Sequence, residues 1–87
     1  MNQFPKVLKG AQCLNDKYRM IQMDLDQVNS VDDVLFQVQT EIDSITFDNN
    51  DWLLDELEEE GKTEKQIDRM KSTALKHLNN FLSYTRR

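Results

Sequence analysis

The chain has 87 residues, a formal net charge of −5 and a sequence pI of about 4.7. This length has room for one domain with one hydrophobic core, so residues 1–87 are expected to form a single domain. Charged or amide residues interrupt every apolar run, which excludes a membrane span of about 18 apolar residues. Cys13 is the only cysteine, and the first residues lack the basic and apolar stretches of a secretory signal. These features favour a reducing, cytoplasmic location.

Charge is segregated along the chain into three blocks. Residues 1–19 carry four basic residues and one acid, residues 20–61 carry thirteen acids and no lysine or arginine, and residues 62–87 carry seven basic residues and two acids. An acidic block of this size attracts basic partners and repels polyanions. The charge layout therefore favours a protein partner with a basic surface and disfavours nucleic acid.

Apolar residues near the N-terminus alternate spacings of four and three, which places them on one stripe of a helix. This stripe consists of Val7, Ala11, Leu14, Tyr18, Ile21, Leu25 and Val28. Pro5 suits a first helical turn, and Asn29 with Ser30 interrupts the pattern. We expect a helix over about residues 5–28 that protrudes beyond its neighbour. A protruding stripe favours coiled-coil contact with a second copy, although packing within one chain explains the same spacing.

Capping signals divide the remaining chain into further helices. Ser30 and Asp33 have the spacing of a capping pair before an apolar pattern over about residues 31–46. A short third helix over about residues 51–60 ends before Gly61, which suits the position just after a helix. Thr63 and Gln66 form a second capping box before a last helix over about residues 64–85. One uninterrupted helix from residue 51 onward is the alternative, and we prefer the break.

Amphipathic helices joined by short turns bury their apolar stripes most economically against one another. The sequence therefore predicts an all-α fold, a small antiparallel helical bundle of three to four helices.

The side chains that carry catalysis or bind cofactors do not occur in recognisable combinations. His77 and Cys13 are lone residues without the flanking elements of a nucleophile and its base. Residues 48–59 share acid or amide positions with a calcium loop, but Trp52 and Leu53 occupy the fifth and sixth positions, where a ligand and a glycine are needed. We expect no metal, no cofactor and no enzymatic activity.

An acidic segment beside the only tryptophan is the best candidate for a binding surface. A large aromatic side chain within a charged rim has the character of a binding hot spot. The alternative is a solvated helix face in which the tryptophan covers the core. The candidate protein-binding residues are Asp48, Asp51, Trp52, Asp55, Glu56, Glu58, Glu59 and Glu60.

These observations favour a non-enzymatic protein that binds another protein as a regulatory adaptor or inhibitor. A sharper version is a nucleic-acid mimic or phage-type antagonist, whose acids replace phosphates in a basic groove. The alternative function is a self-associating coiled-coil scaffold or secretion-type chaperone, a homo-oligomer assembled through the first helix.

Overall fold

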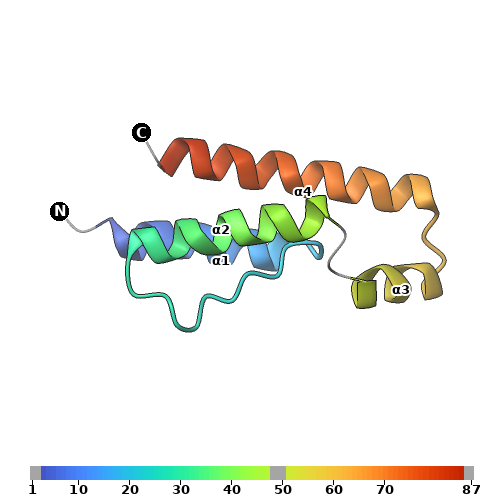
Figure 1. The fold of residues 1–87 in the computed structure, drawn as a ribbon, viewed down its shortest axis with the longest axis horizontal. Helices are drawn as coiled ribbons and strands as arrows, with labels where there is room; N and C mark the ends of the chain where they lie inside the picture. The colour runs from blue at the N-terminus through green and yellow to red at the C-terminus, as the bar shows by residue number, and fades with distance from the viewer. Residues whose placement is uncertain (1–2, 48–50, 86–87) are drawn as a thin grey trace.

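A computed structural model describes residues 3–47 and 51–85 of the chain, which form four helices and no strand (Figure 1). The helices are α1 (Phe4–Lys17), α2 (Val31–Thr46), α3 (Asp51–Glu59) and α4 (Glu64–Thr85). None of these helices is both long and apolar enough to cross a membrane. The predicted all-α fold class is confirmed, and the predicted bounds of the last three helices agree with the structure to within one residue.

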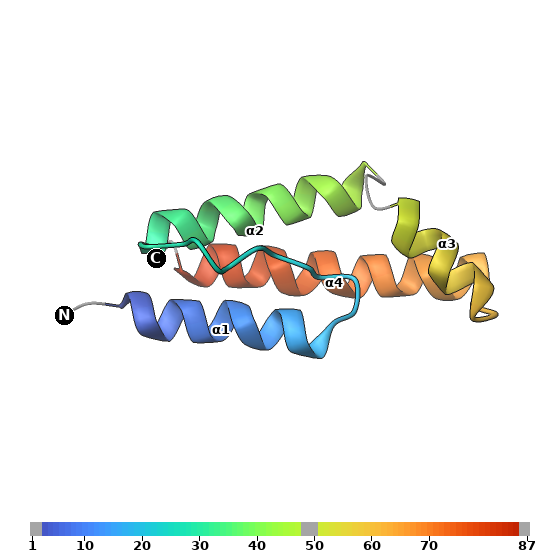
Figure 2. The ribbon, with the colours of Figure 1, turned by 90° about the horizontal axis from the view of Figure 1, so that it is seen from below.

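The helices form an elongated bundle with extents of 46 × 23 × 20 Å. Helix α4 runs along α1 and α2 in the opposite direction, while α3 lies at the end of the bundle where α4 begins (Figures 1 and 2). Helices α1 and α2 run in the same direction, because residues 18–30 return along the bundle before α2 starts (Figure 2). The antiparallel arrangement that we expected therefore holds for α4 against both neighbours, but not for α1 against α2.

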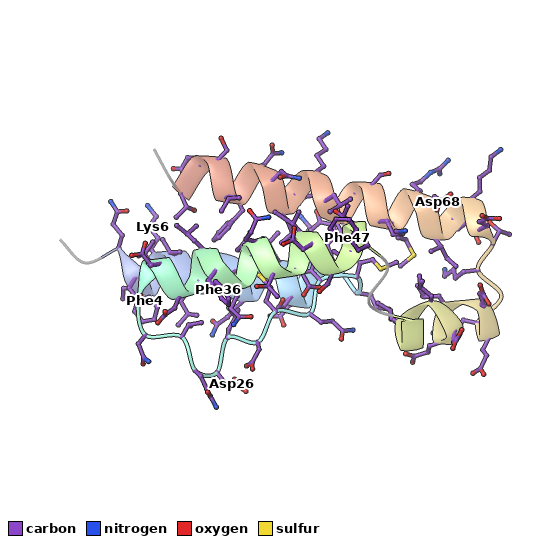
Figure 3. The ribbon with its side chains drawn as sticks, in the orientation of Figure 1. Phe4, Lys6, Asp26, Phe36, Phe47 and Asp68 are labelled. Carbon is purple, nitrogen blue, oxygen red and sulfur yellow. The ribbon has the colours of Figure 1, made fainter. Side chains whose placement is uncertain are left out.

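One hydrophobic core runs through the bundle and receives side chains from all four helices and from the return segment. Figure 3 shows how the side chains fill the space between the ribbons. The largest buried contributions come from α2 and α4, whose apolar residues recur at helical spacing. The buried core consists of Ala11, Met20, Ile21, Met23, Val34, Val38, Ile42, Ile45, Leu53, Leu57, Ile67, Ala74, Leu78 and Leu82.

Local capping chemistry sets the helix boundaries that the sequence predicted. The Asp33 N–H donates to Ser30 Oγ at 3.2 Å at the start of α2. Thr63 and Gln66 exchange two hydrogen bonds at the start of α4, with distances of 2.9 and 3.2 Å. Gly61 follows α3 with φ of 89°, a left-handed conformation that glycine adopts at little cost. The predicted break at Gly61 is therefore confirmed, and the uninterrupted helix is wrong.

Two aromatic contacts hold α1 against α4. A Cβ on Gly10 would lie only 3.0 Å from Phe81 Cε2, so the missing side chain of Gly10 lets the Phe81 ring approach. Further along, the rings of Tyr18 and His77 stack with centroids 4.7 Å apart and an interplanar angle of 26°. Gly10 therefore costs helix propensity but permits close packing of these two helices.

The predicted end of the first helix is wrong, because α1 stops at Lys17 and Tyr18 adopts an extended conformation. The Asn15 side chain accepts the Met23 N–H and donates to the Met23 carbonyl, both at 2.9 Å. The Gln22 N–H donates to Glu41 Oε1 at 3.0 Å. These bonds satisfy backbone groups that a continued helix would have paired internally. The return segment also buries two methionines, Met20 and Met23, that lie outside the predicted stripe.

Glu41 on α2 is the one buried charged residue among those whose burial the structure describes, and it is only 7% exposed. Burial raises the pKa of the Glu41 carboxyl above its ordinary value, and the hydrogen bond from Gln22 opposes part of this rise. A raised pKa in the folded state means that folding favours the protonated form of Glu41. Its stabilising contribution is therefore complete below the ordinary value of 4.5 and is lost as pH rises through the folded pKa.

We predict that Glu41→Gln is at least as stable as the wild type at about pH 7, because the amide oxygen still accepts the Gln22 N–H without an ionisation cost. Urea unfolding followed by circular dichroism at about pH 4 and about pH 7 measures the difference. The advantage of Glu41→Gln should shrink toward acid pH. Glu41→Ala is the matched control that removes the acceptor, and it should be about 1 kcal/mol less stable than Glu41→Gln. An increase in the stability of the wild type relative to Glu41→Gln as pH rises would contradict this account.

Candidate protein-binding site

Helix α3 is fixed to the end of the bundle by two fully buried leucines. Leu53 and Leu57 are 1% and 0% exposed and lie one helical turn apart on the face that meets the core. The Gly61 N–H donates to the Glu58 carbonyl at 3.0 Å, and the Lys62 N–H donates to the Leu57 carbonyl at 3.1 Å. This pair of bonds is a Schellman motif, which ends α3 and turns the chain into α4. The opposite face of α3 is therefore held toward solvent.

The structure places the predicted acidic residues on that solvent-facing side as far as they are described. Exposed carboxylates lie at Asp55, Glu56, Glu58, Glu59 and Glu60. Asp48 lies outside the described residues, and Asp51 and Trp52 begin α3 without a described side chain. The predicted role of Trp52 as a binding anchor therefore stays a prediction, as does the alternative that it covers the core.

Arg19, in the return segment, binds Glu60, 41 residues further along the chain, and also Glu56. Its Nη1 donates to Glu60 Oε1 at 2.7 Å, and its Nη2 lies 3.0 Å from Glu56 Oε1 and also pairs with Glu60 Oε2. The planar guanidinium thus binds Glu60 through both terminal nitrogens and Glu56 through one of them. A lysine ammonium cannot provide this geometry. This contact is not predictable from the sequence, because no local pattern links the two segments.

The ion pairs shift the titration of both partners in the directions expected for opposite charges. The hydrogen bond from Arg19, together with the charges of Arg19 and Lys62, lowers the pKa of Glu60. The hydrogen bond to Glu60 and the charges of both glutamates raise the pKa of Arg19 above its ordinary value. All three side chains are solvent-exposed, so salt screens the attraction. Arg19 therefore positions α3 more than it stabilises the fold.

Three of the α3 carboxylates whose side chains the structure describes do not contact Arg19. Asp55, Glu58 and Glu59 form no ion pair within 4.0 Å among the residues that the structure describes. Their spacing of three and four residues places them side by side on one face of the helix. We call this set the free acidic face of α3. Among the described members of the predicted site, these are the carboxylates that are exposed and form no ion pair.

We predict that Arg19→Gln loosens α3, because the glutamates lose their shared cation. Hydrogen exchange of the α3 amides at low salt should become roughly twofold faster or more, while the circular dichroism spectrum stays helical. Lys17→Gln is the control with the same charge change, since Lys17 forms no ion pair with a described residue.

In the wild type, the ion pairs of Arg19 with Glu56 and Glu60 should persist at neutral pH and be lost as pH falls below 4.5 through the lowered pKa of Glu60. Equal hydrogen-exchange rates of the α3 amides in the wild type and in Arg19→Gln would contradict a positioning role of the Arg19 ion pairs.

The two lone reactive side chains lie apart from α3. Cys13 is exposed on α1, and His77 is half-buried against Tyr18. Within the described part of the chain, no three histidine, cysteine, aspartate or glutamate side chains are placed to hold a metal ion together. Comparisons with protein-family models, curated proteins and solved structures found no match. A function for this chain is therefore inferred from its own residues and their geometry.

Proposed function

We propose that this chain is a non-enzymatic adaptor or inhibitor that binds a basic surface of another protein through the free acidic face of α3. The observation that carries the proposal is the presentation of Asp55, Glu58 and Glu59 together on a helix whose other face is locked into the core. Carboxylates held on a folded helix need less ordering on binding than carboxylates on an irregular segment, which favours affinity. Their summed field also steers a basic partner during encounter.

The location of α3 supports docking on a larger surface. The helix lies at one end of an elongated bundle, beside the start of α4, so the bundle behind it does not cover its outer face (Figure 1). A nucleic-acid mimic is the sharper form of the same proposal, in which these carboxylates occupy positions that phosphates would otherwise take in a basic groove. A nucleic-acid mimic should compete with duplex DNA for the same partner. An acidic surface that binds elsewhere on the partner should not compete.

Self-assembly through the first helix has less structural support. That alternative required a long helix with a protruding apolar stripe, and α1 ends at Lys17. Two members of the stripe, Ala11 and Ile21, are buried inside the bundle instead. We therefore carry forward the adaptor or inhibitor as the single proposed function.

The test is retention of host proteins by the immobilised chain at about 0.05 M and about 0.5 M salt. We predict that the triple variant Asp55→Asn, Glu58→Gln, Glu59→Gln loses roughly tenfold or more of the retained partner and that high salt has the same effect. The control variant Asp16→Asn, Asp26→Asn, Asp43→Asn makes the same charge change at exposed positions of α1, the return segment and α2 and should retain the partner. Figure 3 shows Asp26 on the return segment, away from α3.

Two outcomes contradict the proposed function. The first is equal retention by the α3 variant and the wild type, which removes the acidic face from the interface. The second is a wild type that retains no protein in a salt-sensitive manner. Circular dichroism of both triple variants checks that the helices are intact.

A further inference from the structure

A shallow groove lies between the end of α1 and the first half of α4, and Arg19 forms part of its lining. Its volume is about 480 Å³, and its cationic lining comes from Lys17, Arg19, Lys62 and Arg69. Met20, Met70 and Tyr18 supply the apolar part of the lining. The lining contains no acid, although the chain as a whole carries a net charge of −5. The groove is therefore locally positive on a protein whose net charge is negative.

Three of the four cations are not held in a direct ion pair with a described residue, although the charge of Lys62 also acts on Glu60. Lys17, Lys62 and Arg69 form no ion pair within 4.0 Å with any residue that the structure describes, whereas Arg19 is held by Glu56 and Glu60. Lys17 Nζ lies 5.7 Å from the centroid of the Tyr18 ring, a cation–π contact that keeps this charge beside the groove. Charge complementarity therefore requires an anionic occupant.

The floor of the groove requires an apolar part as well. Tyr18 and Met70 are half-buried and supply the accessible apolar surface of the groove, while Met20, only 3% exposed, supports this surface from the core. Methionine side chains adapt to irregular apolar ligands. The Tyr18 ring also stacks on His77. A ligand that offered only charge would leave the exposed parts of Tyr18 and Met70 uncovered.

The surroundings of the groove favour a compact anion over an extended polyanion. Glu56 and Glu60 bind Arg19 at the edge of the groove, within the distance of about 8–10 Å over which charges act at physiological salt. They repel any anion that extends past Arg19, so an occupant has to be short enough to stay on the side of Lys17, Lys62 and Arg69. A groove of about 480 Å³ is also the size of a small-ligand site and accommodates a few side chains of a peptide.

We propose that this groove binds a short acidic peptide segment of a partner protein. Carboxylates of the segment pair with Lys17, Lys62 and Arg69, and one apolar side chain covers Met70 and the Tyr18 ring. This site is separate from the free acidic face of α3 and selects the opposite charge. The end of the bundle therefore offers neighbouring acidic and basic surfaces, which fix the orientation of a partner that carries both.

The probe for the test is an acetylated octapeptide of alternating glutamate and leucine, added to the isotopically labelled full chain. Backbone amide shifts of residues 17–20 and 62–73 should change in a saturable manner. The double variant Lys62→Glu, Arg69→Glu should weaken binding roughly tenfold or more, and the milder pair Lys62→Gln, Arg69→Gln should weaken it less. Lys6→Glu, Lys9→Glu makes the same charge change near the start of α1 and should bind within about twofold of the wild type. Figure 3 shows Lys6 at the end of the bundle opposite α3.

Several results would overturn the peptide site. They are the absence of saturable shifts, equal binding of a peptide with glutamine in place of glutamate, and equal or tighter binding of inorganic phosphate or duplex DNA at the same amides. Shifts at these amides that depend only on protein concentration would show that a second copy occupies the groove and would also overturn the proposal. The variant Asp55→Asn, Glu58→Gln, Glu59→Gln should bind the peptide at least as well as the wild type. That comparison distinguishes failure of this groove from failure of the α3 interface.

Discussion

The end of α1 at Lys17 is the constraint on which the remaining arrangement depends. The Asn15 side chain bonds to both backbone groups of Met23, and Glu41 accepts the N–H of Gln22, so an irregular segment packs into the core with these backbone groups paired. Because this segment returns along the bundle, α2 can start at the same end as α1 and run parallel to it. A helix continued to residue 28 would instead have favoured an antiparallel hairpin with α2.

The same return segment organises the charged surfaces. It places Arg19 against α3, where the guanidinium binds Glu56 and Glu60. It also places Tyr18 and Met20 beside Lys62 and the first half of α4, which creates the cationic groove. The sequence-level pattern of an acidic middle between basic ends thus becomes two adjacent surfaces of opposite sign. Arg19 lies between them and contributes to both.

Local chemistry made much of the fold predictable from the sequence. Ser30 before α2, Thr63 with Gln66 before α4, and Gly61 after α3 act through bonds to nearby residues, so their positions determine helix ends directly. The exposure of the α3 acids was predictable from another local feature, because the helical spacing of Leu53 and Leu57 assigns the buried face to them. The apolar spacing that suggested a longer first helix was misleading, because an irregular segment that packs against the core satisfies the same burial.

The non-local contacts were not predictable in this way. Nothing near Asn15 in the sequence indicates that its side chain pairs with the backbone of Met23, and nothing near Arg19 indicates α3. The groove depends on three segments that meet only after folding. Asp24 and Asp26 did offer one signal, since two acids are unfavourable at the negative end of a helix dipole. The structure removes that conflict, because α1 does not reach these residues.

The most direct test is an NMR measurement of backbone chemical shifts and amide exchange over residues 15–30. Our account predicts that helical shifts end near Lys17 and that residues 19–29 have non-helical shifts. The amides of Gln22 and Met23 should nevertheless exchange slowly, because Glu41 and Asn15 accept their protons. Continuous helical shifts through Val28 would contradict the return segment, and with it the positions of Arg19 and the groove.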